Sequence, residues 1–251
     1  MAENPYSAPE APLYGGGPAP SAPKPPSFLD QVVGVFTEPT ALFQKLRQSP
    51  SWIPAVVSFC ILGIGVTLVW GLKVDVDAMA RPALERNPNV SAGQIDSIIE
   101  MQKKFMVPIG LIFAVAIPWL WTLLMGFIYW LVGRGLAEEG EPSFPQALTA
   151  ASVPALVGLV HGALMIIMAF LRPVGGLTPE KLAPTSVGFF VAAESPKVVT
   201  ALFALDLFSI ATWALSYLAC RHLLRLKVSG AILSTCLLVF LQAGLKIIFA
   251  K

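Results

Sequence analysis

Polar side chains inside apolar stretches are the residues of this 251-residue chain whose chemistry stands out. Asp206, His161 and Gln242 each fall within a run of apolar residues. A carboxylate in a membrane-spanning segment costs about 2.5 kcal/mol or more unless it has a partner. Together, an aspartate and a histidine could form a proton or cation site. The same side chains could instead form interhelical hydrogen bonds worth about 1 kcal/mol each.

The depths of these three side chains would allow them to meet. With a rise of about 1.5 Å per residue, Asp206 lies roughly 5 Å from the middle of its segment, His161 roughly 3 Å and Gln242 roughly 4 Å. Successive segments alternate in direction, so all three side chains fall on the same side of the membrane midplane. We therefore define Asp206, His161 and Gln242 as a candidate intramembrane polar cluster.

The sequence lacks the signatures of common enzyme classes. Intramembrane aspartyl proteolysis needs two acids within the spans, and only Asp206 qualifies. A nucleophilic serine would need a Gly-x-Ser-x-Gly setting, and Ser229-Gly230 lacks the preceding glycine. Two histidines are too few for a histidine-rich metal site, and there is no phosphate-binding glycine loop. We expect no catalysis, no cofactor and no metal.

Five apolar stretches would position the polar cluster. A span of about 20 apolar residues matches a hydrocarbon core of about 30 Å. Hydrophobic residues make up 55% of the chain and charged residues 13%, with a mean hydropathy of +0.71, which leaves too little polar surface for a soluble domain. The stretches are 52–72, 105–132, 147–171, 199–220 and 229–250. We predict an all-α, polytopic integral membrane protein with five transmembrane helices across 51–251.

The chain before the first span divides into two parts. Residues 1–27 are rich in proline and glycine, which predicts a disordered tail. Residues 28–50 contain two helix starts, a capping box from Ser27 to Asp30 and a second start with Pro39 at the first helical position. Both segments are amphipathic, which favours interfacial helices on the membrane surface. Packing against the ends of the spans explains the same pattern and is compatible with it.

Small residues and prolines predict details of helix packing. Stripes of small side chains allow two helices to approach closely in lipid, whereas a proline removes an amide donor and kinks a helix. The first stripe is Gly63, Thr67 and Gly71, and the second is Ala151, Ala155, Gly158 and Gly162. The prolines inside spans are Pro108, Pro118 and Pro154. A further helix is expected after Ser91, within the long connection 73–104.

Charge gives two answers about orientation. With the N-terminus inside, seven basic residues lie on the cytoplasmic side and ten on the other. The positive-inside rule applies best to short loops, and the shortest connection, 221–228, is the most densely basic. This loop favours a cytoplasmic tail and an outer C-terminus. The net charge of +2 is too small to indicate nucleic acid as a partner.

One set of residues matches the pattern of a known family. Its positions are Phe36, Pro39, Phe43, Trp52, Pro54, Asp206, Phe208 and Trp213. In these residues the chain resembles the bacterial branch of the Yip domain family, named for Ypt/Rab-interacting proteins, and the likeness covers about residues 36 to 250. The resemblance implies a five-helix membrane domain with a cytoplasmic N-terminus. Eukaryotic relatives contact Rab GTPases, but their Asp-Leu-Tyr-Gly-Pro signature is absent, so a Rab role is not carried over.

These observations favour a non-enzymatic membrane scaffold or adaptor in a bacterial cytoplasmic membrane. The expected partners are the lipid bilayer and other membrane or cytoplasmic proteins, and a homo-oligomer is left open. The alternative is a small transporter or channel that uses Asp206, His161 and Gln242. A water-filled route should place polar residues along a line through the membrane, and here they cluster at one depth.

Overall fold

Helices make up the regular structure of the residues that the computed structural model describes, which are 24–178, 181–191 and 195–250. Within these ranges four helical stretches are long and apolar enough to cross a bilayer. They are Ile53–Gly71, Ala92–Leu136, Phe144–Leu171 and Val228–Ile248. The all-helical, multi-pass character is therefore confirmed, whereas the count of five spans stays a prediction.

Helices α1 (Phe28–Thr37) and α2 (Pro39–Gln48) begin where the sequence predicts. The Ser27 hydroxyl accepts from the Asp30 amide at 3.2 Å, and the Asp30 carboxylate accepts from the Ser27 amide at 3.0 Å. Phe43 and Leu46 are fully buried and belong to the main core, where α2 packs against α10 and α1 packs against η1. Packing against the spans is thus confirmed. Residues 1–23 of the predicted tail lie outside the described residues.

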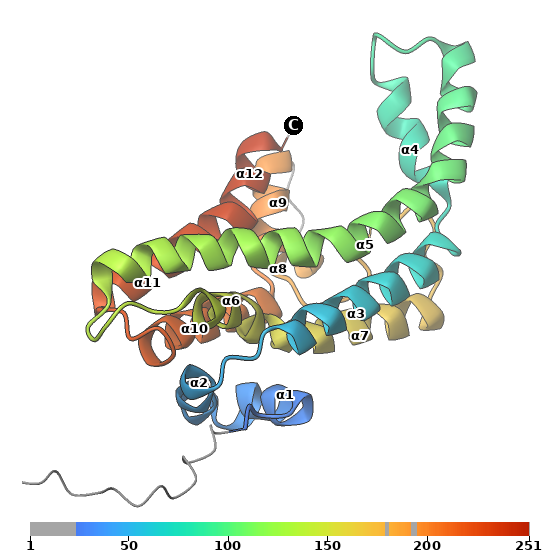
Figure 1. Cartoon of the computed structure of the whole chain (residues 1–251). Coiled ribbons are helices and arrows are strands. Elements are labelled where there is room, and N and C mark those ends of the chain that lie inside the picture. Colours follow the sequence, from blue (N-terminus) through green and yellow to red (C-terminus); the bar gives the residue numbers. More distant parts are fainter. Residues whose placement is uncertain (1–23, 179–180, 192–194, 251) are drawn as a thin grey trace, which may run out of the picture.

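The second span is part of a much longer helix than predicted. Helix α5 (Ala92–Leu136) has 45 residues, or about 67 Å at 1.5 Å per residue, and crosses the whole molecule in Figure 1. Its N-terminal end rises beside α4 (Val76–Glu85). The predicted capping box at Ser91 starts it. Pro108 and Pro118 lie inside it without ending it.

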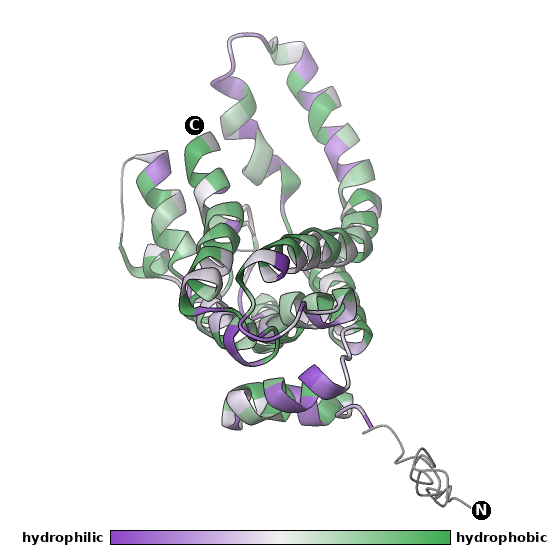
Figure 2. Cartoon of the chain, turned by 60° about the vertical axis from the view of Figure 1, so that its left-hand side comes forward, coloured by the Kyte–Doolittle hydropathy of each residue, from purple (hydrophilic) through white to green (hydrophobic). Residues whose placement is uncertain are grey.

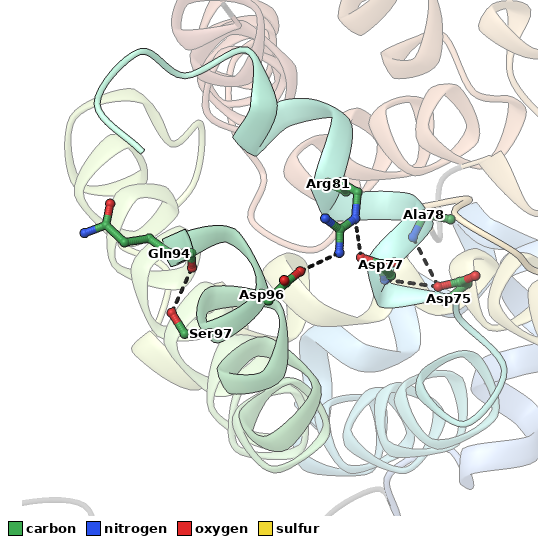
Figure 3. A network of polar contacts seen from close by, with 7 residues as sticks. All are labelled: Asp75, Asp77, Ala78, Arg81, Gln94, Asp96 and Ser97. Atoms are coloured by element: carbon green, nitrogen blue, oxygen red, sulfur yellow. Dashed lines mark hydrogen bonds and ion pairs between the residues drawn. The ribbon is translucent and has the colours of Figure 1, made fainter. Parts of the chain in front are cut away.

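A polar network centred on Arg81 of α4 joins this helix to the start of α5. The Arg81 guanidinium binds the Asp77 carboxylate at 2.9 Å and the Asp96 carboxylate at 2.7 Å (Figure 3). Asp75 caps α4 by accepting from the amides of Asp77 and Ala78. These contacts tie α4 to the start of α5, because Asp96 lies in the first turns of that helix.

The small-residue stripe of α3 (Ile53–Gly71) packs closely against another helix as predicted, and the structure identifies that helix as α5. A Cβ atom added to Gly63 would lie 3.3 Å from both the Cβ and the carbonyl oxygen of Ala114. A Cβ atom on Gly110 would lie 2.8 Å from Thr67 Cγ2, so each helix presents small residues to the other. The close approach of α3 and α5 therefore depends on these positions.

The third and fifth predicted spans are helical throughout but not uniformly α-helical. The third consists of α6 (Phe144–Ser152), a 3₁₀ segment η1 (Val153–Val157) and α7 (Gly158–Leu171). Pro154 lies in η1, so the predicted disturbance occurs where this proline lacks an amide donor. The fifth consists of α11 (Val228–Val239), a π-helical segment η3 (Phe240–Gly244) and α12 (Leu245–Phe249).

The fourth predicted span, 199–220, was wrong as one continuous helix. After the short α8 (Val187–Phe190), the chain forms α9 (Pro196–Ala204) and α10 (Leu207–His222), which are separated at Leu205 and Asp206. The amide of Val187 donates to the Leu205 carbonyl and that of Leu207 donates to the Thr185 carbonyl, both at 3.1 Å. These bonds satisfy backbone groups that a continuous helix would have paired internally.

Exposed apolar side chains mark the membrane-facing surface. Figure 2 shows hydrophobic residues along the middle of α5, with hydrophilic residues at its turn with α4 and on the α1–α2 pair. Along α5, the exposed apolar residues include Ile109, Ile112, Phe113, Ile117, Leu120 and Leu124. Such a large apolar surface is unusual for a water-soluble protein and typical of helices in lipid. Helices α9 and α12 lie side by side near the C-terminus (Figure 1).

Candidate functional site

Asp206 is the N-cap of α10 and not a residue inside a helix. Its backbone is extended, and its Oδ1 atom accepts from the amides of Phe208 at 2.9 Å and Ser209 at 3.2 Å. Aspartate is among the best N-cap residues because its oxygen satisfies amides that have no helical partner. The expected mid-helix acid is therefore corrected to a helix start, which gives one carboxylate oxygen two donors.

The second oxygen of Asp206 faces His161 of α7. Oδ2 lies 3.5 Å from His161 Nδ1, close enough for an ion pair but longer than an ordinary hydrogen bond. This oxygen is buried and makes no hydrogen bond within the described residues. The hydroxyl of Thr185 lies 3.3 Å from the same imidazole nitrogen. Two predicted members of the polar cluster thus meet, and Thr185 joins them.

Phe208 fixes the position of the imidazole. Its ring lies 5.3 Å from the His161 ring, centroid to centroid, at an interplanar angle of 80°, which is a favourable edge-to-face arrangement. Because the amide of Phe208 also binds Asp206, one residue connects the helix cap to the histidine. Asp206 and Phe208 are both positions of the predicted family motif.

Gln242 takes a different partner from the one expected. Its Oε1 atom accepts a hydrogen bond of 2.8 Å from the indole nitrogen of Trp213. Gln242 lies in the π-helical segment η3, and Trp213 lies in the second turn of α10. The glutamine therefore connects two segments at the edge of the site and does not bind Asp206 directly.

These side chains line a cavity of about 860 Å³. Asp206, His161 and Gln242 contribute to its wall, with Ser209 and Trp213 from α10. Ser209 and Trp213 are four residues apart, so they share one side of α10, and that side faces the cavity. The arrangement holds an aspartate and a histidine beside a space of ligand size.

Four of the other predicted motif positions start a helix or pack within the fold, whereas Phe36 does neither. Pro39 occupies the first turn of α2, and Phe43 is fully buried. Trp52 precedes α3 and packs edge-to-face on Trp119, with ring centroids 5.6 Å apart, while Pro54 lies in the first turn of α3. Phe36 is exposed on α1.

A second polar site, which the sequence did not predict, lies where helix α2 meets two of the connections between helices. We name it the loop face. It surrounds a cavity of about 730 Å³ formed by α2, the α5–α6 connection and the α10–α11 connection. Its lining is Gln44, Arg47, Gln48, Glu138, Gln146, Arg221, His222 and Arg225.

Ion pairs join the three segments of the loop face. Glu139 lies between Arg225 and Arg47, at 3.7 Å from the latter. Arg221 binds Glu138 at 2.7 Å, and this hydrogen bond lowers the pKa of the Glu138 carboxyl below its ordinary value. Glu138 therefore stays ionised at neutral pH. These pairs are partly exposed, so each adds little stability on its own, but together they set the positions of the segments.

Arg225 has a backbone conformation that arginine rarely adopts. Its φ of 54° is the one positive value for a residue other than glycine in the part of the chain that the structure describes. Its carbonyl accepts from the Glu138 amide at 2.7 Å, and the Lys227 amide donates to the Leu136 carbonyl at 2.8 Å. Glycine would fit this conformation without strain. The arginine side chain forms an ion pair with Glu139, which a glycine at this position could not make.

Local sequence signals could have found only part of these sites. The N-cap preference of aspartate was a readable signal at Asp206, although the apolar residues around it favoured a continuous span. The loop face had no such signal, because its charged residues come from segments far apart in sequence. Among the described residues, no group of three or more histidine, cysteine, aspartate or glutamate side chains is placed to hold a metal.

Comparison with known proteins gives one family. A family model of the Yip1 domain matches residues 33–249, which includes both sites. No curated protein and no solved structure matches the chain.

Proposed function

The chain belongs to the Yip1 domain family, and we propose that it is a non-enzymatic membrane adaptor that binds other proteins through the loop face. The observation that carries the proposal is the ion-paired arrangement of that face. Glu139 lies between Arg47 of α2 and Arg225 of the α10–α11 connection. A preformed polar surface of this kind binds a partner at a lower entropic cost than mobile loops would.

The first helix supports a position at the membrane surface. Helix α1 buries Gln31 and Val35 against the protein, while Leu29 is 69% exposed. Phe28, Val33 and Phe36 are exposed as well. A helix with one face on the protein and a second apolar face uncovered is suited to the interface between head groups and acyl chains. This arrangement would hold α2, and with it Arg47, beside the membrane.

The loop face would lie in the cytoplasm. The connection 221–228 is short and densely basic, as the positive-inside rule expects of cytoplasmic loops. We propose a bacterial cytoplasmic membrane as the location, with the N-terminus inside and the C-terminus outside. In this orientation the proline-rich tail and the loop face are on the same side, where both can meet cytoplasmic proteins.

Site-specific photo-crosslinking in native membranes tests the adaptor role. A photoreactive residue at Gln44, which lines the loop face, should capture a discrete protein. The same residue at Glu85, at the end of α4, is the matched control and should not capture it. Capture should fail when Arg47→Glu and Arg225→Glu are combined. Equal capture from positions 44 and 85, or capture that survives the double variant, would contradict the proposal.

The alternative, a small transporter or channel, rests on the pair formed by the buried Asp206 and the half-buried His161. Vesicles with a pH or cation reporter test it directly. If the protein carries protons or cations through Asp206, wild type should show flux and Asp206→Asn should not, because an amide neither releases a proton nor neutralises a cation. Such a result would replace the adaptor role. The same leak rate in wild-type, variant and empty vesicles would remove the alternative.

A further inference from the structure

Departures from α-helical geometry in three different segments meet at the cavity beside Asp206. The 3₁₀ segment η1 contributes Ala155, the break between α9 and α10 contributes Asp206, and the π-helical segment η3 contributes Gln242. Backbone outside regular helices is tolerated at membrane depth where it is buried or lines a cavity, and π-helical turns are frequent at functional sites. Because all three irregular segments line it, we interpret this cavity as a specific feature of the fold and not as a packing defect.

One polar atom in this cavity lacks a hydrogen-bond partner. The Asp206 side chain is only 10% exposed, its Oδ1 atom is used by the helix cap, and its Oδ2 atom is buried without a hydrogen bond. His161 Nδ1 lies beside Oδ2 at 3.5 Å but is closer to the Thr185 hydroxyl. A buried carboxylate oxygen without a hydrogen bond favours a cationic donor, because a charge-assisted hydrogen bond offsets the cost of burial.

The rim of the cavity carries two lysines, and one of its walls is apolar. Lys181 and Lys246 both line it and are exposed, and neither forms an ion pair within the residues that the structure describes. Ile117 of α5 lines it too and is 55% exposed. The apolar wall thus continues into the lipid-facing surface of α5. A carboxylate lies inside, two amines lie at the rim, and an apolar path leads outward.

We propose that this cavity binds the head group of an aminophospholipid. The primary ammonium group would donate to Asp206, the phosphate would lie at Lys181 and Lys246, and the acyl chains would leave past Ile117. The volume of about 860 Å³ is far larger than a bare ion needs and lies in the range of small-molecule sites. A zwitterion with its cation at the tip matches the carboxylate inside and the amines at the rim. This lipid site is separate from the adaptor role of the loop face.

Lipids with the same acyl chains but different head groups test the site. The full-length protein in detergent would be analysed by native mass spectrometry with phosphatidylethanolamine, phosphatidylcholine and phosphatidylglycerol. We expect phosphatidylethanolamine to bind about tenfold or more tightly than phosphatidylcholine, whose trimethylated nitrogen has no N–H to donate to Asp206. Asp206→Asn should abolish this preference. Lys181→Gln combined with Lys246→Gln should weaken the binding of both lipids and leave their ratio unchanged.

Two further experiments ask whether the ligand is a lipid or a soluble molecule, and whether the loss of preference is specific to Asp206. Glycerophosphoethanolamine has the same head group without acyl chains, and competition by it at concentrations equal to those of the lipid would identify a soluble ligand and overturn the lipid assignment. Glu141→Gln removes an exposed acid outside this cavity and should keep the preference.

Equal retention of phosphatidylethanolamine and phosphatidylcholine by wild type would overturn the proposal. So would tighter binding of phosphatidylglycerol than of phosphatidylethanolamine, or a preference that persists in Asp206→Asn. If Asp206→Asn does not fold, the wild-type lipid series and the lysine variant decide the question by themselves.

Discussion

The indole nitrogen of Trp213 donates a hydrogen bond of 2.8 Å to Oε1 of Gln242. This bond connects α10 to the π-helical segment of the last span. Both residues line the same cavity as Asp206, so the bond helps to set the distance between two of its walls.

Removal of the acceptor should therefore destabilise the protein. Gln242→Leu leaves the indole N–H of Trp213 without its partner, which should cost about 1–3 kcal/mol. Trp213→Phe with Gln242→Leu should cost less than the sum of the two single changes, because no donor is then left unpaired. Thermal unfolding of the four proteins in detergent measures this coupling. Additive losses would show that the bond contributes nothing.

The cap at Asp206 gives a second prediction. Asp206→Asn should keep most of the stability, because asparagine caps helices about as well as aspartate. Asp206→Leu should lose about 1–2 kcal/mol, since the amides of Phe208 and Ser209 lose their acceptor. Melting temperatures of the two variants in the same detergent decide it. Equal melting of both variants would show that the cap has no energetic role.

Two substitutions at Arg225 test whether the backbone is strained at this position of the loop face. Both Arg225→Gly and Arg225→Ala remove the ion pair with Glu139. The side chains of Arg225 and Glu139 are partly exposed, so the loss of this pair lowers the stability of each variant by at most about 1 kcal/mol. The glycine variant should nevertheless be more stable than the alanine variant by about 1 kcal/mol, because only glycine adopts a φ of 54° without strain. Chemical unfolding of the pair measures this difference. An alanine variant as stable as the glycine variant would argue against strain.

The contact between α3 and α5 gives a prediction with an internal control. Gly63→Leu should destabilise the protein by about 1–3 kcal/mol, because even its Cβ would meet the backbone and side chain of Ala114 at 3.3 Å. Gly135→Leu is the matched control, because a Cβ atom there meets nothing within 4 Å. Thermal unfolding of both variants should show a loss only for the first. A similar loss in both would mean that the effect comes from leucine itself and not from the contact.

Topology is the last prediction. With the native cysteines replaced, Arg225→Cys should react with a membrane-impermeant thiol reagent only after the cells are opened, whereas Lys251→Cys should react in intact cells. The reason is the dense positive charge of the connection 221–228. Labelling of position 225 from outside, without labelling of 251, would reverse the orientation.

The sequence alone determined those features that depend on a few neighbouring residues. The caps at Ser27 and Ser91 and the start at Pro39 were predictable, because a cap joins groups within three or four residues of each other. The membrane setting followed from runs of apolar residues matched to the bilayer. The stripe from Gly63 to Gly71 was also readable, since positions four apart share one side of a helix.

Only the tertiary structure decided how the spans are interrupted and which polar groups meet. The break at Asp206 is stabilised by backbone hydrogen bonds to Thr185 and Val187. These partners lie outside the segment 199–220, so the periodicity within that segment could not reveal them. His161 and Gln242 lie at similar depth to Asp206, so depth alone would let both approach it. In the structure His161 faces Asp206, whereas Gln242 accepts a hydrogen bond from Trp213. Such pairings depend on how whole helices pack, and that balance of packing energies cannot be read from one segment at a time.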